Sequence, residues 1–259
     1  MTISVASAFY NDKKMLALNL KSILEQTYPD IEYIVADGGS TDGTVELLKE
    51  YENKFRQTGK KLVWRSEKDN GLYEAFNKAA SLATGDYLIF GTDPYINSGV
   101  FADLAQDLAR TDADYVYGGM YFQKDGRIIR SWSGKPGNWR LGWMAATPTL
   151  CMKRAVWEKH GPMDEKYKSA SDYKLQLSLF RDKTLRSYPL NRVLVMYYAG
   201  GTSNGGIKAN VNSILECHEI LRESNVRFGW FTNLCKTAIA FFAYTFASRK
   251  QVILEGEQP

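Results

Sequence analysis

The chain has 259 residues, of which 44% are hydrophobic and 24% are charged, and its formal net charge is +4 at pH 7. This length suits one α/β domain with appended elements, or at most two small domains, and the composition is ordinary for a folded chain, which argues against intrinsic disorder. The small positive charge, without a DNA- or RNA-reading motif, argues against nucleic acid as the partner.

The cysteines Cys151, Cys217 and Cys235 are few and scattered, without a CxxC pair. They argue against a disulfide framework or a zinc site and favour a reducing compartment. The amino-terminal residues begin a strand pattern without the basic region and apolar core of a signal peptide. No stretch reaches the ~18–20 apolar residues that span a bilayer. We therefore expect a cytoplasmic protein.

Strand and helix patterns alternate through the first part of the chain. Short apolar runs predict strands at 3–9, 31–36, 61–65 and 86–90. Apolar residues at helical spacing predict helices at 12–26, 44–55 and 72–83. Repeated βα units of this kind predict a mostly parallel sheet with helices on both faces.

The pattern changes after a helix predicted at 100–110 and a strand predicted at 114–117. Two further strand patterns, 120–123 and 127–132, flank an Asp-Gly turn signal, so we expect antiparallel strands at the sheet edge. The later predicted elements are helices at 155–160 and 172–180, a strand at 193–198, and helices at 207–223 and 231–246.

Asp37 comes directly after the second predicted strand and opens a loop that reads GGSTDG. This position puts its carboxylate at the carboxyl end of a parallel strand, where open α/β sheets bind ligands. Glycine lets the backbone approach a ligand closely, and Asp42 is suited to cap the next helix. An ordinary strand–turn–helix connection explains the same residues equally well.

Seven segments extend this pattern over much of the chain. In order they read VASAFYN (5–11), VADGGSTDGT (35–44), DNGLYEAFNKA (69–79), ATGDYLIFGTD (83–93), PTLCMKR (148–154), SASDYKLQL (169–177) and YYAGGTSN (197–204). Together they resemble family-2 glycosyltransferases of the GT-A fold, above all bacterial enzymes that build O-antigen or other surface polysaccharide. The resemblance implies an α/β domain at 1–206, with a Rossmann-like, mostly parallel mixed sheet flanked by helices, and a C-terminal helical extension at 207–259.

The resemblance also implies an inverting transfer of a hexosyl or N-acetylhexosaminyl group from a nucleotide diphosphate, usually uridine diphosphate, to an acceptor hydroxyl. Within it, Asp37 accepts the ring N–H of the pyrimidine, and Asp172 is the base that removes the acceptor proton. The residues expected to bind the donor are Ser7, Ala8, Phe9, Asp37, Asp69, Gly71, Asn77, Thr92 and Asp93.

The sequence departs from the family pattern at two positions. The fourth strand of the family typically ends in two acidic residues, the last of which ligates Mn²⁺ or Mg²⁺ on the diphosphate, whereas here Asp93 is followed by Pro94. Since proline cannot ligate a cation, we expect Asp93 to be the sole carboxylate ligand. Metal-free positioning of the diphosphate and impaired activity are the alternatives. Thr147 stands where close relatives often carry histidine.

The chemical roles have alternatives of their own. Asp172 is also suited to be the N-cap of its helix, and the nearby acids Asp164 and Glu165 are second choices for the base. The leaving diphosphate could be stabilised by a metal or by one of three basic side chains, Lys153, Arg154 and Lys208. The glycine-rich segment Gly200–Gly206 suits a lid over the donor or a plain connection.

The tail from Phe228 is rich in aromatic residues and carries Lys236, Arg249 and Lys250. It suits a helix lying on the cytoplasmic face of the inner membrane, or one that packs on the catalytic domain or on a second subunit in a homo-oligomer. Three tryptophans could stack on an acceptor sugar or belong to the core: Trp132, Trp139 and Trp143.

The expected partners are a nucleotide-sugar donor and a glycan or lipid-linked acceptor. The alternative function is a non-catalytic nucleotide-sugar-binding or scaffold subunit of a polysaccharide assembly. Pro94 and Thr147, the two departures from the family pattern, suggest it.

Overall fold

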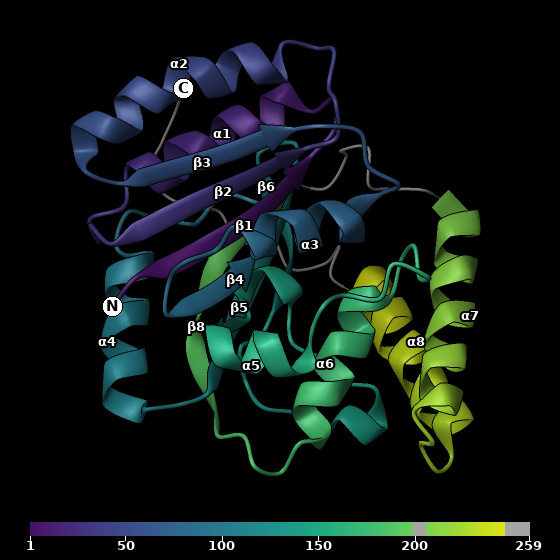
Figure 1. Ribbon diagram of the computed structural model, residues 1–259. Helices are drawn as coiled ribbons and strands as arrows, with labels where there is room; N and C mark the ends of the chain where they lie inside the picture. The colour runs from purple at the N-terminus through teal and green to yellow at the C-terminus, as the bar shows by residue number, and fades with distance from the viewer. Residues whose placement is uncertain (199–205, 247–259) are drawn as a thin grey trace.

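The computed structural model describes residues 1–198 and 206–246, and the side chains of residues 1–198 and 211–240. Its strands are β1 (Ile3–Phe9), β2 (Ile31–Asp37), β3 (Lys61–Ser66), β4 (Tyr87–Phe90), β5 (Tyr115–Lys124), β6 (Arg127–Trp132), β7 (Cys151–Lys153) and β8 (Ser187–Tyr198). They form one eight-stranded sheet in the order β3-β2-β1-β4-β7-β5-β6, with β8 paired to β5 (Figure 1).

The helices are α1 (Lys13–Leu24), α2 (Thr44–Thr58), α3 (Leu72–Ser81), α4 (Val100–Thr111), α5 (Arg154–His160), α6 (Ser171–Arg181), α7 (Gly206–Glu223) and α8 (Gly229–Phe246), with short 3-10 turns η1 (Trp139–Leu141) and η2 (Thr147–Thr149). α1, α2 and α4 pack on one face of the sheet, and α3, α5 and α6 on the other. In β1, Ile3 and Val5 belong to the first core and Ala6 and Ala8 to the second, because successive side chains of a strand point to opposite faces.

The strands β1 to β4 run parallel, as the sequence predicts. Phe9 is level with Asp37, and Ala6 is level with Phe90. The loops after β1, β2 and β4 therefore leave the sheet on the same side, which we call the carboxyl edge. The donor residues expected from these three loops all lie at this edge.

The structure differs from the prediction in the antiparallel part of the sheet. Residues 114–117 and 120–123 are predicted as two strands but belong to β5, since Gly118 marks a close approach and not a break. A Cβ on Gly118 would lie 2.7 Å from the Leu194 side chain of β8. β7 is missing from the prediction because three residues are too few to show a periodic pattern. β7 nevertheless joins β4 to β5.

The capping prediction at α2 is only partly right. Gly43 occupies the cap position, but Asp42 Oδ1 does accept a hydrogen bond from the Thr44 backbone N at 3.1 Å. Asp42 Oδ2 also accepts the Lys13 backbone N at 2.8 Å. One carboxylate therefore fixes the first turns of both α1 and α2 below the carboxyl edge.

The two C-terminal helices pack on the α/β domain through a third core. Cys217 and Leu221 of α7 belong to this core together with Leu177 of α6. α8 lies beside η1, where the Thr232 hydroxyl donates a 3.0 Å hydrogen bond to the Arg140 carbonyl. Within the described ranges, no helix has the length and apolar character needed to cross a bilayer.

Gly142 sets the distance between α8 and the domain. Its φ is +79°, and a Cβ built on it would lie 2.5 Å from the Lys236 Cα, so that no other residue fits without moving α8. Gly126, in the turn between β5 and β6, has a φ of +76°, but a Cβ there would meet nothing within 4 Å. Substituting either glycine adds backbone strain, but only a substitution at Gly142 also adds steric crowding, so a comparison of the two distinguishes these effects.

Replacing Gly142 by alanine is expected to destabilise the protein more than replacing Gly126. Both changes add the strain of a left-handed residue, about 1–2 kcal/mol. Only Gly142→Ala adds overpacking, which typically costs about 1–3 kcal/mol more. Urea unfolding of the two variants measures the difference in free energy of unfolding. Equal losses would show that α8 does not rest on Gly142.

Candidate functional site

Asp37 ends β2 and is buried at the carboxyl edge. Its Oδ2 accepts hydrogen bonds from the backbone N of Gly39 (3.2 Å) and Ser40 (3.0 Å) and from the Ser66 hydroxyl (2.5 Å). Its Oδ1 accepts one hydrogen bond, from the Ser40 hydroxyl. These donors fix the loop after β2, while Oδ1 keeps acceptor capacity for a ligand N–H.

Asp69 lies against this loop. A Cβ on Gly38 would lie 2.7 Å from Asp69 Oδ2 and 3.2 Å from the Tyr10 ring, so the bare backbone lets both side chains close in. Asp69 Oδ1 accepts the Gly71 backbone N at 2.9 Å, just before α3. Asp37 and Asp69 border the same small cavity, of about 10 Å³. Tyr10, which the sequence analysis did not single out, is 63% exposed directly after β1. Its position as an aromatic residue directly after a predicted strand could have identified it from the sequence as a candidate for contact with a ligand.

The expected contacts of Ser7, Ala8 and Phe9 with a nucleotide base stay a prediction. All three side chains are buried in the sheet, and the Ser7 hydroxyl donates to the Gly91 carbonyl just after β4. The Phe9 carbonyl accepts the Gly38 backbone N at 2.9 Å. These bonds join the ends of β1, β2 and β4 into one rigid edge.

Thr92 and Asp93 lie just beyond β4. The chain is held there because the Pro94 carbonyl accepts the Met196 backbone N of β8 at 2.9 Å. Asp93 is only 9% exposed, and burial raises the pKa of its carboxyl to about 7. Neither Asp93 oxygen accepts a hydrogen bond from the residues that the structure describes, so the carboxylate keeps its capacity for a ligand.

The residues at Asp93 fit a metal ion that is shared with a substrate. In the described part of the chain, no three His, Cys, Asp or Glu side chains gather closely enough to hold a metal by themselves. Mg²⁺ commonly takes one or two protein carboxylates and completes its shell with water and substrate phosphates. Asp93 can supply one such carboxylate, so the site suits a metal that arrives with a diphosphate.

Asp172 lies in the first turn of α6. The capping alternative is wrong, because Ala170 occupies the cap position without a side-chain bond. Asp172 Oδ2 accepts the Thr147 hydroxyl at 2.7 Å, and Oδ1 accepts the Tyr73 hydroxyl at 3.0 Å. Gln176 Nε2 in turn donates to Thr147 Oγ1 at 2.8 Å. Burial and the neighbouring Asp172 carboxylate raise the pKa of Tyr73, which keeps this hydroxyl a donor.

Asp172 borders a cavity of about 280 Å³. We call it the large cavity to distinguish it from the small one beside Asp37 and Asp69, although a third cavity, next to Asp164 and Glu165, is larger still at about 490 Å³. The β5–β6 hairpin, the loop before η2, α6 and the two C-terminal helices line it. Trp132 faces this cavity, and its Nε1 donates to the Met144 carbonyl at 3.1 Å. Trp143 packs instead against the second core and Trp139 against the third, so one of the three tryptophans is placed to meet a ligand there.

The three acidic residues expected to act together border different parts of the site. Asp37 borders the small cavity, Asp172 borders the large one, and Asp93 borders neither. Asp93 and Asp172 are nonetheless linked, since a Cβ on Gly91 would touch Pro148 of η2 at 3.4 Å. A single ligand that reaches all three carboxylates therefore has to extend beyond either cavity.

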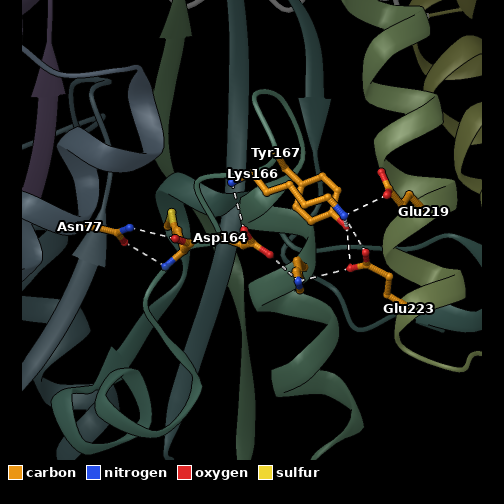
Figure 2. Close-up of polar contacts among 8 residues, drawn as sticks. Asn77, Asp164, Lys166, Tyr167, Glu219 and Glu223 are labelled. Carbon is orange, nitrogen blue, oxygen red and sulfur yellow. Dashed lines mark hydrogen bonds and ion pairs between the residues drawn. The ribbon is translucent and has the colours of Figure 1, made fainter.

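A polar network holds the loop that leads into α6 (Figure 2). On one side, Asn77 of α3 accepts the Met163 backbone N at 2.9 Å and donates to the Met163 carbonyl at 2.8 Å. On the other side, Lys166 Nζ lies 2.9 Å from Glu219 and 2.6 Å from Glu223 of α7. The Lys166 ammonium lowers the pKa of Glu223 to about 2. The loop is therefore tied to both α3 and α7.

Three sequence candidates belong to this network. Asn77 is expected to bind the donor, yet its amide is engaged by Met163 and by Glu165 Oε1 at 2.9 Å, so donor binding by Asn77 stays a prediction. Asp164 pairs with Lys174 at 2.5 Å. Asp164 and Glu165, the second choices for the base, border a separate cavity of about 490 Å³ and not the one beside Asp172.

Two basic side chains considered for the leaving group lie at the wrong edge of the sheet. Lys153 of β7 is level with Tyr87, the first residue of β4, and pairs with Asp114 at 3.0 Å. Arg154 follows it directly, whereas Asp93 lies beyond the other end of β4. Of the alternatives considered for the leaving group, these two therefore lie away from the expected position of the diphosphate. Outside the described side chains lie Lys208, Arg249, Lys250 and the expected lid at 200–206, of which only the Gly206 backbone is described, at the start of α7.

Comparison with known proteins identifies similar chains. The model of the family described as Glycosyl transferase family 2 matches residues 4–170. A PGL/p-HBAD biosynthesis glycosyltransferase from Mycobacterium bovis (strain BCG / Pasteur 1173P2) is 27% identical over 204 residues, which cover 75% of this chain and 76% of the relative. Glycosyltransferase GlyG from Streptococcus pneumoniae is 34% identical over 120 residues, 46% of this chain and 39% of the relative.

Solved structures share the fold. Staphylococcus aureus TarS in complex with UDP matches with a TM-score of 0.63 and 17% identity, over 95% of this chain and 72% of that chain. The mannosyltransferase PcManGT from Pyrobaculum calidifontis, in complex with GDP-Man and Mn²⁺, matches with a TM-score of 0.63 and 18% identity, over 95% and 71%. At such low identity the likeness shows the fold alone, and the GT-A fold predicted from the sequence is confirmed.

Replacing Asn77 by alanine is expected to destabilise the protein by about 1–3 kcal/mol, because the buried Met163 backbone N loses its partner. Asn53, exposed on α2, is the matched control, and Asn53→Ala should change stability by less than about 0.5 kcal/mol. Urea unfolding compares the two variants. Equal stability of the two variants would show that the hydrogen bonds between Asn77 and the Met163 backbone are not needed to hold the loop.

Proposed function

The chain belongs to glycosyl transferase family 2 and is a glycosyltransferase, and on this premise we propose that it moves a hexosyl or N-acetylhexosaminyl group, with inversion, from UDP to a hydroxyl of a glycan or lipid-linked acceptor. The observation that carries the proposal is the Asp172 carboxylate, held by two hydroxyls at the wall of the large cavity. A carboxylate fixed in this way beside a space for a ligand suits a general base.

In the proposed reaction, the acceptor oxygen attacks the anomeric carbon on the face opposite the diphosphate. Its proton passes to Asp172, the bond between the anomeric carbon and the diphosphate oxygen breaks, and the electron pair leaves with UDP. Thr147 and Tyr73 orient the carboxylate for this transfer. Neither hydroxyl has to move, so the geometry is set before the acceptor arrives.

The donor is proposed to lie along the carboxyl edge. Asp37 Oδ1, with its remaining acceptor capacity, would receive the ring N–H of uracil, and Asp69 and Gly71 would border the same end of the nucleotide. Thr92 and Asp93 would lie at the ribose and the diphosphate. The structures of TarS with UDP and with UDP-GlcNAc support a uridine nucleotide as the donor.

A divalent ion, Mn²⁺ or Mg²⁺, is proposed to join Asp93 to the diphosphate. When bound, the metal would neutralise charge on the departing diphosphate. The structure of PcManGT with GDP-Man and Mn²⁺ supports a metal in this fold. With proline at position 94, the substrate oxygens have to supply much of the metal's coordination shell.

The acceptor is proposed to be a bacterial surface glycan or glycolipid assembled at a membrane. The mycobacterial relative is named for PGL/p-HBAD biosynthesis, which supports a role in the assembly of a glycosylated product. One side of α8 packs on the domain, but Phe228, Trp230, Phe231 and Leu234 near its start are exposed. Arg227 lies beside the Phe228 ring, and basic and aromatic residues together suit contact with an anionic membrane surface.

Asp172→Asn is expected to fold normally and to lose turnover by about 10²–10⁴-fold, because asparagine keeps the shape of the side chain but accepts no proton. The measurement is release of UDP from UDP-glucose, UDP-galactose and UDP-N-acetylglucosamine, after a thermal-shift screen has chosen the donor. Water serves as the acceptor in this assay.

Asp164→Asn is the matched control for this experiment. It removes an acid of the loop that leads into α6; this acid pairs with Lys174 and does not border the large cavity. We expect it to keep turnover within about threefold of the original chain. Full turnover by the Asp172 variant, or an equal loss in both variants, would remove Asp172 from the role of base.

Metal binding is expected to depend on the nucleotide. Mn²⁺ alone should leave the melting temperature unchanged. UDP with Mn²⁺ should raise it more than UDP with a chelator, because the metal strengthens UDP binding to the folded chain. A ligand at 100 times its Kd adds about 2.7 kcal/mol to the free energy of unfolding. Asp93→Asn should abolish the increment due to Mn²⁺ and keep the shift due to UDP alone. An unchanged increment in that variant would contradict a metal at Asp93.

A further inference from the structure

The large cavity beside Asp172 carries two basic side chains. Arg130 of β6 and Lys236 of α8 both line it, and they come from opposite walls, the β5–β6 hairpin and the C-terminal helix. Asp172 is the acidic residue among the lining residues. Two cations therefore face one carboxylate, which is already engaged by two hydroxyls.

Arg130 is held in place by stacking and not by an acid. Its guanidinium carbon lies 4.3 Å from the centre of the Phe122 ring and 5.3 Å from that of Trp132. Stacking leaves the edge of the guanidinium open, and Nε is buried without a hydrogen-bond partner among the described residues. Since buried donors normally have partners, this one points to a ligand or water.

Lys236 is placed in a similar way. Its Nζ lies 5.1 Å from the centre of the Tyr173 ring, and no ion pair joins it to an acid within the described ranges. Burial raises the pKa of the neighbouring Cys217 thiol, while Lys236 acts in the opposite direction. Several lysines elsewhere in the fold are paired with acids; Lys166, for example, contacts two glutamates of α7.

Two further buried polar atoms at this cavity also lack partners in the described part of the chain. They are the Tyr173 hydroxyl and Gln176 Oε1, on neighbouring turns of α6. Both residues are almost fully buried and line the cavity with Trp132. A hydroxyl donor, an amide acceptor and an indole ring together suit the hydroxyls and the apolar face of a sugar.

We propose that the large cavity is the acceptor subsite and that Arg130 and Lys236 select an acceptor sugar carrying an anionic group, a carboxylate or a phosphate. The proposal rests on the proposed function, because it places the acceptor beside Asp172. A guanidinium that stacks on aromatic rings binds a carboxylate or phosphate through its edge. Tyr173 and Gln176 then receive sugar hydroxyls, and one of these hydroxyls faces Asp172.

The donor diphosphate is the other anion that a glycosyltransferase binds. The cavity borders Asp172 but neither Asp37 nor Asp93, the residues proposed to hold the two ends of the nucleotide. An anion between Arg130 and Lys236 would thus lie on the acceptor side of the base. The experiment includes UDP to distinguish the two sources.

The test compares matched pairs of probes on the full chain in the absence of donor. Titration calorimetry measures the Kd of methyl β-D-glucuronide against methyl β-D-glucoside, and of glucose 1-phosphate against glucose. We expect at least one charged probe to bind about tenfold more tightly than its neutral partner, since hydrogen bonds to charged groups are stronger than neutral ones. Preference for the glucuronide indicates an acidic sugar, and preference for glucose 1-phosphate indicates a sugar phosphate.

Arg130→Gln and Lys236→Gln should each abolish the preference for the charged probe and leave the neutral probe and UDP unaffected. Arg127→Gln, at the exposed start of β6, is the matched control and should keep the preference. If Arg130→Gln disturbs the fold, shown by a lowered melting temperature, Lys236→Gln carries the test alone.

Three results would overturn the proposal. The first is that the original chain binds charged and neutral probes equally well. The second is that the variants lose affinity for charged and neutral probes alike. The third is that the same variants lose affinity for UDP, which would assign the two cations to the donor. Turnover of the donor is measured separately. Donor hydrolysis without a preference for the charged probe would contradict only this inference. A preference for the charged probe without donor hydrolysis would contradict the proposed function.

Discussion

The site depends on one constraint, the fixing of the Asp172 carboxylate by hydroxyls from two other segments. Thr147 belongs to η2, Tyr73 belongs to α3, and Asp172 itself opens α6. η2 packs on the end of β4 and α3 packs on β1 and β2, so the carboxylate is tied to the parallel sheet that forms the carboxyl edge. The position of the proposed base is thereby set by the fold and not by a loop alone.

The C-terminal helices complete this arrangement. Without α7 and α8 the large cavity would be an open surface of the β5–β6 hairpin and α6, because Cys217 and Lys236 form its far wall. Because Gly142 has no side chain, the α8 backbone can lie close to it, and this contact sets the distance between α8 and the rest of the cavity wall. The sequence predicts contact of this extension with a membrane, with the catalytic domain or with a second subunit. In the structure, both helices pack on the domain and shape the cavity beside the proposed base.

Much of the parallel sheet could be predicted from the sequence, because each of its strands is short, apolar and followed by a helix of clear period. β7 and the continuity of β5 could not, since they depend on pairing partners distant in the chain. The same holds for the site. Asp37 was expected from a strand–turn–helix motif and Asp172 from the family resemblance, but the hydroxyls of Thr147 and Tyr73 that hold Asp172 are contacts between distant segments. Lys153 stayed an open alternative because the sequence does not reveal that β7 runs antiparallel to β4.

The two parts of the proposed site differ in charge. The carboxyl edge carries three acidic residues, whereas the cavity beside Asp172 carries two basic ones, Arg130 and Lys236. Asp37, Asp69 and Asp93 lie at the carboxyl edge, and Arg65 and Lys78 line the small cavity beside the first two. In the proposed site, a diphosphate beside Asp93 needs a cation that offsets the negative charge of both groups. Since Lys153 lies at the opposite edge, a metal shared between Asp93 and the diphosphate meets this requirement with few protein ligands. With proline at position 94, the proposed metal would bind the empty protein less well than the complex, because in the complex the phosphates would supply further oxygen ligands. A lone carboxylate is in this way compatible with catalysis, provided that metal and donor bind together.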